Sequence, residues 1–315
     1  MLCTRVYPYL VAALCLVGGE TAAHAATISY ADAVTTLASS CGEDIRKLCR
    51  GVSLANNDIG RCLTEKVAEV SPQCTTTLAD VTASIELRRR AQSIVARECR
   101  NDAENLCQGV VPGEAHILHC LIAASRATSR ECEHVITDAG WRAQPDGRPG
   151  LSSQQVIGGL QAAAGAAASI DPALLAQEAR ENVNRERGAT LPAWNQLSGL
   201  PQLTVEINFE YDSIAIVPDS YRAVGLIADA LHNPILLGNK FLIVGHTDAT
   251  GKREYNLHLS QRRADAIKDA LSTTFAVPAD TLFTVGVGEE EPIDPAHPDA
   301  SINRRVQIFN IGQVE

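Results

Sequence analysis

Several features are scarce or missing in this chain. No apolar run after Ala25 is long enough to cross a bilayer as a helix. No C-x-x-C occurs, which disfavours dithiol redox catalysis. Acidic residues outnumber basic ones, giving a net charge of −10 and a pI near 5.3. The chain therefore lacks the overall basic character expected of a nucleic-acid-binding protein, and non-specific adhesion to anionic lipid is equally disfavoured.

The N-terminal segment that ends at Ala25 has the pattern of a secretory signal peptide. MLCTRVYPYLVAALCLVGGETAAHA has one arginine, an apolar run from Tyr9 to Gly19, and small residues at Ala23 and Ala25. The run is too short to span a bilayer, although an uncleaved anchor is the alternative. A lipid anchor on Cys15 is disfavoured because Leu14 before it is bulky. We expect a periplasmic protein, associated with the cell wall or outer membrane of a Gram-negative envelope, with no transmembrane segment after cleavage.

The cysteines beyond the signal peptide form a tandem repeat. One set lies at positions 41, 49, 62 and 74, and a second set repeats the same spacing at positions 99, 107, 120 and 132. An even number of cysteines in an exported chain predicts a disulfide framework. If the segments around the Gly51 turn are antiparallel helices, facing residues have nearly constant index sums. This favours the nested pairs Cys41–Cys74, Cys49–Cys62, Cys99–Cys132 and Cys107–Cys120 over the crossed pairs Cys41–Cys62 and Cys49–Cys74.

A metal site is the alternative for the same segment. His116 and His119 lie close to Cys120, but their first-repeat counterparts are Asp58 and Arg61, and the spacing lacks the short cysteine pairs of structural zinc sites. We expect no metal and no cofactor. The cysteine spacing of each repeat is C-x7-C-x12-C-x11-C, and each repeat also contains CRGV or CQGV and a CL pair. This pattern resembles the cysteine-rich repeat of a Golgi sialoglycoprotein. The resemblance implies an all-α, disulfide-bonded interaction or spacer module over 26–138, with repeats at about 30–80 and 88–138.

The composition changes between residues 139 and 201. RAQPDGRPGLSSQ is rich in turn formers and LQAAAGAAAS is of low complexity, whereas PALLAQEARENVNRER favours a short exposed helix. We interpret this segment as a linker.

Residues 202–315 show the periodicity of one compact α+β domain. Strand-like and helix-like segments alternate and end in two successive strands, which predicts a βαβαββ mixed sheet packed by helices. The strands are expected at 203–211, 240–246, 281–288 and 304–312, and the helices at 220–232 and 253–271.

A group of charges surrounds the turn after the second predicted strand. Asp248 lies in the sequence GHTDATG, and Asn256 and Arg263 share one face of the following helix, away from its apolar stripe. Asp248 and Arg263 could simply bridge to each other, as many surface pairs do. The functional interpretation is a pocket for a free amino-acid centre, in which the aspartate takes the ammonium and the arginine forks onto the carboxylate.

Four ordered motifs carry a family resemblance. F-x-Y-D-S at 209–213, GHTDATG at 245–251, N-x-x-LSQRRA at 256–264 and NRRV at 303–306 resemble the peptidoglycan-binding domain of the outer membrane protein A (OmpA) family, which also occurs in peptidoglycan-associated lipoproteins and flagellar stator proteins. The resemblance implies that Asp248 and Arg263 hold the meso-diaminopimelate of the stem peptide. It also implies a pocket lined, partly through backbone groups, by Thr247, Asn256, Asp212, Ser213, Arg305 and Val306.

The expected function is therefore non-catalytic, non-covalent peptidoglycan binding that localises an exported protein to the wall. The alternative is an envelope interaction protein whose repeats bind the main ligand or a protein partner, with the C-terminal domain as a tether. A zinc hydrolase using His246, Asp248 and His258 is a third, disfavoured hypothesis, because a binding site accounts better for Arg263. GEEEP at 288–292 is interpreted as a solvated loop.

Overall fold

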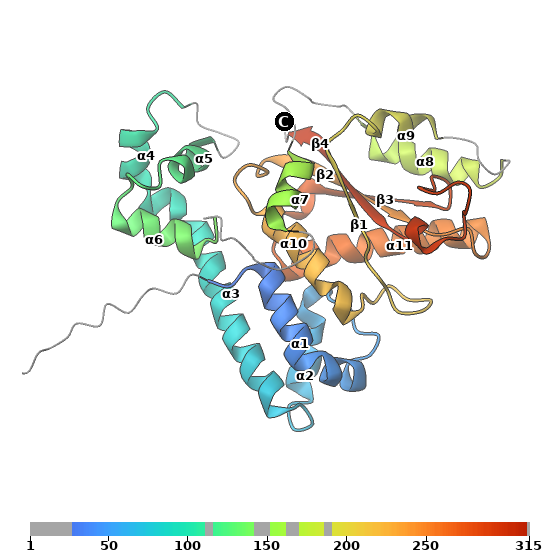
Figure 1. Ribbon diagram of the computed structural model, residues 1–315, viewed down its shortest axis with the longest axis horizontal. Helices are drawn as coiled ribbons and strands as arrows, with labels where there is room; N and C mark the ends of the chain where they lie inside the picture. The colour runs from blue at the N-terminus through green and yellow to red at the C-terminus, as the bar shows by residue number, and fades with distance from the viewer. Residues whose placement is uncertain (1–26, 111–115, 142–151, 162–169, 186–190, 314–315) are drawn as a thin grey trace, which may run out of the picture.

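The computed structural model describes residues 27–110, 116–141, 152–161, 170–185 and 191–313. The expected signal peptide, residues 1–25, lies outside them. The first repeat consists of α1 (Tyr30–Leu48), α2 (Asp58–Glu65) and α3 (Pro72–Glu98), and the second of α4 (Arg100–Leu106), α5 (His116–Ala123) and α6 (Arg130–Asp138) (Figure 1). Helix α3 runs from one repeat into the other, so the two repeats share it. Within the described residues, no helix is both long enough and apolar enough to span a membrane.

Both repeats use the same cap. Ser71 begins α3, with its hydroxyl accepting from the Cys74 amide at 3.3 Å and Pro72 at the first helical position. The Asp44 carboxylate of α1 accepts from the Ser71 hydroxyl at 2.7 Å, and Asp102 accepts from Ser129 at 2.8 Å in the same way. The repetition of these residues at the same spacing therefore has a structural cause, because each aspartate ties one helix to the start of another.

The four disulfides have the expected nested pairing. Two of them join residues 33 apart in the sequence, and two join residues 13 apart. The bonded pairs are Cys41–Cys74, Cys49–Cys62, Cys99–Cys132 and Cys107–Cys120.

The C-terminal part is the expected α+β domain. Its elements are β1 (Gln202–Val205), α10 (Tyr221–Leu231), β2 (Asn239–His246), α11 (Arg253–Asp269), β3 (Leu282–Gly288) and β4 (Val306–Gln313). The strand order is β1-β4-β2-β3, with β2 parallel to β3 and β4 antiparallel to both β1 and β2. The predicted βαβαββ mixed sheet is thus confirmed, and the antiparallel insertion of β4 brings the NRRV segment beside the end of β2.

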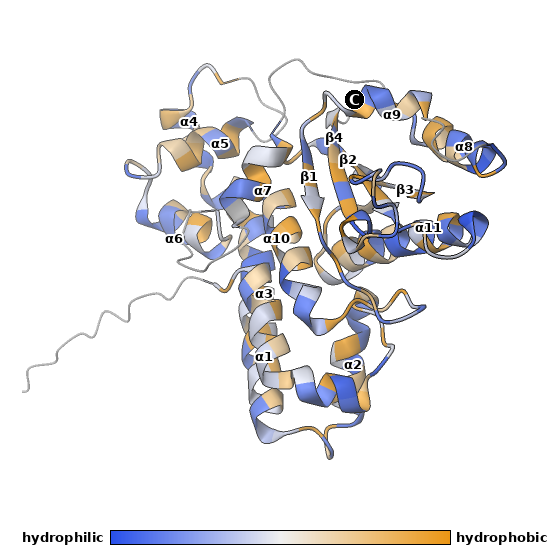
Figure 2. Cartoon of the chain, turned by 45° about the vertical axis from the view of Figure 1, so that its right-hand side comes forward, coloured by the Kyte–Doolittle hydropathy of each residue, from blue (hydrophilic) through white to orange (hydrophobic). Residues whose placement is uncertain are grey.

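Helices cover both faces of this sheet. On one face, Ile243 and Ile308 share a core with α10 and α11; on the other, Leu242 and Phe309 share a second core with α8 (Pro172–Asn182) and α9 (Pro192–Leu197). Figure 1 shows α8 and α9 on the opposite side of the sheet from α11. Figure 2 shows hydrophobic residues along β2 and α10, and hydrophilic residues on the outer turns of α8 and α11.

The segment interpreted as a linker is therefore partly structural. Besides α8 and α9 it contributes α7 (Ser153–Leu160), whose Val156 and Leu160 are fully buried in the core shared with α10. The physical reason lies in β2, whose FLIV run is apolar on both faces. A strand of this kind needs a cover on each side of the sheet, and the helices before β1 supply the second cover.

The first repeat is joined to the α+β domain through a buried charge. Asp229 of α10 accepts from the backbone amides of Tyr30 and Ala31, each at 2.9 Å, and from Nη2 of Arg88, also at 2.9 Å. The side chains of Arg88 and Asp229 are 4% and 5% exposed. Helix α1 packs along α10, and one apolar cluster runs from the first repeat into the sheet. The two parts of the chain thus form one packed body.

Candidate functional site

Two residues of the predicted site lie where β2 ends. Thr247 and Asp248 follow the strand directly and are both buried. The amide of Thr250 donates to Oδ1 of Asp248 at 3.0 Å, so the carboxylate shapes its own turn, as aspartates commonly do. The amide of Thr247 donates to the Gly288 carbonyl at 2.9 Å, and its buried hydroxyl has no hydrogen-bond partner within the described part of the chain.

Asn256 holds this turn from the first turns of α11. Its Nδ2 lies 3.2 Å from the carbonyl oxygens of both Asp248 and Thr250 and 2.7 Å from Oε2 of Glu289. The amide group is buried and already surrounded by acceptors. We conclude that Asn256 acts by fixing the position of Asp248.

Arg263 lies further along the same helix and faces the hairpin at 209–216. Its guanidinium carbon is 4.8 Å from the centre of the Phe209 ring, and its Nε lies 3.4 Å from the Ser213 carbonyl. Burial lowers the pKa of Arg263 from its ordinary value, the neighbouring Arg304 lowers it further, and Asp248 and Asp212 act in the opposite direction. A lowered arginine pKa still leaves the group charged at neutral pH.

The hairpin reaches the site through Asp212 as well. Asp212 has a φ of +49°, in the left-handed region that aspartate tolerates better than most residues. Its Oδ1 accepts from the hydroxyl of Tyr255, which lies on α11. The FEYDS motif is thereby tied to the helix that carries Arg263.

The NRRV segment contributes in a way that the sequence analysis missed. Nη1 of Arg304 lies 2.5 Å from Oδ2 of Asp248, with 48% and 11% of the two side chains exposed. Arg304 was not among the expected pocket residues. Its only sequence signal was its place in the NRRV motif, and the antiparallel pairing of Gly245 with Val306 is what brings it to Asp248.

The next arginine turns inward. Arg305 donates to Oε1 of Gln307 from Nε at 3.1 Å and from Nη2 at 2.8 Å, and Nη2 also donates to the Glu291 carbonyl at 2.7 Å. Burial lowers its pKa to about 10. Val306 is 2% exposed and pairs with Gly245. At Arg305 and Val306 the side chains are committed to the interior, and the Arg305 carbonyl accepts from the His246 amide at 3.0 Å.

The interpretation of GEEEP as a solvated loop was wrong. Glu290 is 7% exposed, forms an ion pair with Arg253 at 2.6 Å and accepts from Nδ2 of Asn182 at 2.7 Å. Glu291 accepts from the Leu191 amide at 3.0 Å. These carboxylates join α8 and the start of α9 to the beginning of α11, an arrangement that a charge run does not reveal by itself.

His246 is buried in the interior, where its ring contacts Trp194. It is 3% exposed, and its ring meets the ring of Trp194 edge-on with centroids 5.3 Å apart. Burial and the nearby Arg305 guanidinium hold its pKa well below the usual value. Across the described residues, no three His, Cys, Asp or Glu side chains cluster as metal ligands would.

Comparisons with known proteins find two matching families in this chain. The family model for the OmpA family matches residues 208–305, and a model for a cysteine-rich repeat matches 72–129. A peptidoglycan-associated lipoprotein of Pseudomonas putida is 33% identical over 147 residues, covering 46% of this chain and 81% of the relative. The chain belongs to the OmpA family.

Two further proteins are similar to part of this chain. The peptidoglycan-associated lipoprotein of Pseudomonas aeruginosa is 38% identical over 102 residues, 32% of this chain, and the chain spans only 58% of that relative. The solved cell wall anchor of the T6SS from Pseudomonas aeruginosa is 23% identical, with coverage of 44% of this chain and 97% of that one and a TM-score of 0.31. The OmpA-like domain is preceded here by the cysteine-rich repeats, an architecture that the two family matches bear out.

Proposed function

We propose that this protein binds peptidoglycan without covalent or catalytic chemistry, through the meso-diaminopimelate of the stem peptide. The observation that carries the proposal is the placement of one acid and one base at one end of the sheet. Asp248 and Arg263 come from different elements, interact electrostatically, and are both held by neighbouring groups. A free amino-acid centre carries the complementary ammonium and carboxylate.

The role of each residue in ligand binding follows from the hydrogen-bond donors and acceptors that contacts within the protein leave available. Arg263 uses Nε toward Ser213, and its two Nη groups have no hydrogen-bond partner in the described ranges. They can fork onto a carboxylate with two parallel bonds. Asp248 accepts the ammonium, Asn256 and Thr250 hold its turn, and Thr247 offers its unpaired hydroxyl beside it.

The cellular role follows from this binding. A protein that is exported through a signal peptide and holds diaminopimelate would be retained at the wall of a Gram-negative envelope. The names of the peptidoglycan-associated relatives support this location. In this proposal the chain is a tether and not an enzyme.

Co-sedimentation with purified sacculi tests the proposal. The mature chain should pellet, and Asp248→Ala or Arg263→Ala should weaken binding by about 2 kcal/mol or more, because one ligand charge then stays unpaired. The matched control is Arg262→Ala, which removes the same charge from an exposed position next to Arg263. Equal pelleting of folded Asp248→Ala and wild type would rule out the assigned pocket. The whole mature chain is needed, since α10 is packed against α1.

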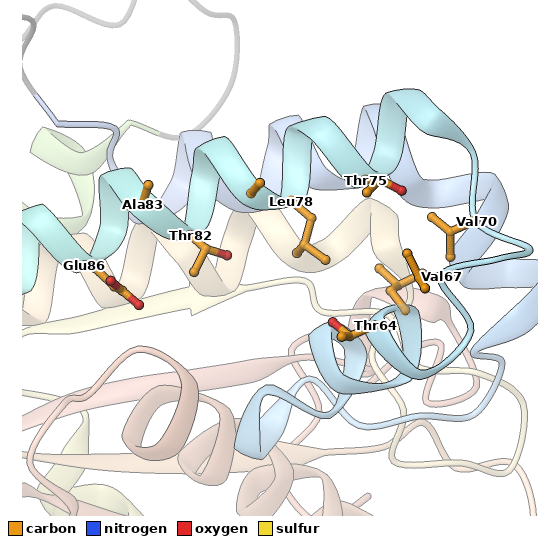
Figure 3. A pocket seen from close by; sticks show the side chains of 10 residues that line it. Thr64, Val67, Val70, Thr75, Leu78, Thr82, Ala83 and Glu86 are labelled. Atoms are coloured by element: carbon orange, nitrogen blue, oxygen red, sulfur yellow. The ribbon is translucent and has the colours of Figure 1, made fainter.

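A specific observation favours the alternative in which the repeats bind a partner. An exposed groove of about 420 Å³ lies in the first repeat, between the end of α2 and α3 (Figure 3). Its lining is mainly apolar and hydroxyl-bearing, and it includes Leu63, Thr64, Val67, Leu78, Ala79 and Thr82. Val67, which is 54% exposed, can be charged without disturbing the core. If Val67→Glu abolishes a cellular phenotype while wall binding persists, the repeats carry the main function and the OmpA-like domain is the tether.

A further inference from the structure

Asp248 is already occupied by a cation in the free protein. Its Oδ1 accepts from the Thr250 amide at 3.0 Å, and its Oδ2 faces Nη1 of Arg304 at 2.5 Å. The carboxylate is only 11% exposed. A buried carboxylate is costly without a counter-charge, so Arg304 stabilises the empty site.

Arg304 differs from its neighbour in how firmly it is held. Arg305 is buried, with its guanidinium bonded to Gln307 and to the Glu291 carbonyl. The Arg304 side chain is 48% exposed, and within the described residues its guanidinium makes one hydrogen bond, to Asp248. Half-exposed ion pairs of this kind contribute little to stability, and a released guanidinium is readily rehydrated. The arginines thus have separate roles, one fixed and one exchangeable.

We propose that Arg304 is a built-in competitor for the ligand ammonium. This inference rests on the proposed function, because it concerns the same pocket. The ammonium takes the place of the Arg304 guanidinium on Asp248, and Arg304 moves into solvent. When Arg304 leaves, Arg263 also loses a like-charged neighbour, which in the free site lowers the pKa of Arg263 by repulsion. Binding is then an exchange of one cation for another, which lowers the affinity of every ammonium ligand by the same factor.

If Arg304 competes with the ligand ammonium, its removal changes ligand affinities in a different way from the removal of a residue that contacts the ligand. Removing a competitor raises the affinity of every ligand that displaces it by the same factor. Removing a residue that touches the ligand carboxylate would instead weaken the ligands that carry this carboxylate. Two soluble probes separate these cases: the tripeptide L-Ala-γ-D-Glu-meso-diaminopimelate, and its counterpart with L-lysine at the third position, which keeps the ammonium but lacks the second carboxylate.

The experiment is calorimetric titration of both tripeptides into the mature wild type, Arg304→Gln and the control Arg262→Gln. Arg304→Gln should bind both peptides roughly two- to fivefold more tightly, by a common factor, and the control should match wild type. Unchanged or weaker binding of the diaminopimelate peptide by Arg304→Gln would overturn the inference while leaving the proposed function intact. If wild type binds neither tripeptide, the proposed function itself is overturned and the inference with it. Arg304→Ala provides a second variant, and thermal melts verify that each protein is folded.

Discussion

Replacing Arg88 with methionine would leave the Asp229 carboxylate buried without its cation. In the native protein this carboxylate accepts one hydrogen bond from Arg88 and two from the amides at the start of α1, all at 2.9 Å. Burial raises the pKa of Asp229, whereas Arg88 and the two amides lower it. Arg88→Met removes one of these stabilising partners and keeps the cost of burial.

The expected magnitude follows from the exposure of the pair. With both side chains about nine-tenths buried or more, removing one partner should cost about 3–5 kcal/mol of unfolding free energy. The matched control is Arg90→Met, two residues along α3. Arg90 pairs with Glu86 at 3.8 Å, with 77% and 61% of the two side chains exposed. Its loss should be no more than about 0.5 kcal/mol.

Urea unfolding of the mature, disulfide-intact protein at neutral pH measures both values. Intrinsic tryptophan fluorescence and far-UV circular dichroism should report a single coincident transition, since one apolar cluster joins the first repeat to the sheet. A loss below about 1 kcal/mol in Arg88→Met would refute the argument. It would mean that the ion pair does not hold the repeat against α10.

Three further predictions concern the interior. Burial lowers the pKa of His232 to about 4, so the folded state resists its protonation. This group should therefore lower the free energy of unfolding by up to about 3 kcal/mol as pH drops from 6.5 toward 4. His232→Gln should make this part of the pH profile less steep, with the buried His246 keeping part of the slope, and an unaltered profile would contradict the prediction. A Cβ at Gly225 would lie 2.6 Å from the α1 backbone, so Gly225→Ala should cost about 1–3 kcal/mol in urea unfolding, whereas Gly158→Ala meets open space and should not destabilise. Paired replacement of Cys49 and Cys62 by serine should lower stability by about 3 kcal/mol, and a loss near zero would show that this bridge does not constrain the unfolded chain.

Local patterns were sufficient for much of the fold. The cysteine spacing predicted the disulfide pairing because short antiparallel helices leave few ways to join residues 13 and 33 apart. Alternating and helical periodicities predicted the order of strands and helices, since burial of one face or both leaves a direct trace in the sequence. The motifs indicated Asp248 and Arg263 as candidate site residues, and their role in binding stays a prediction.

The contacts between distant segments could not be found in this way. The helices α8 and α9 lie in a stretch whose composition indicated a linker, yet they cover a face of the sheet. The only sequence feature that indicated this packing was the FLIV run of β2. It is apolar on both faces of the strand, which predicts burial on both faces but does not identify the elements that pack there. Glu290 likewise belonged to a charge run, and its burial depends on Arg253 and Asn182 approaching from two other helices.

The sequence by itself determined the repeat, its disulfides and the βαβαββ order, and it indicated a candidate acid and base, because each depends on spacing along the chain. Tertiary structure decided that the repeats pack onto the OmpA-like domain through Arg88 and Asp229, and that Arg304 occupies Asp248. These pairs join residues 141 and 56 positions apart. Whether such charges meet depends on how complementary surfaces fold together, and no local period in the sequence records that.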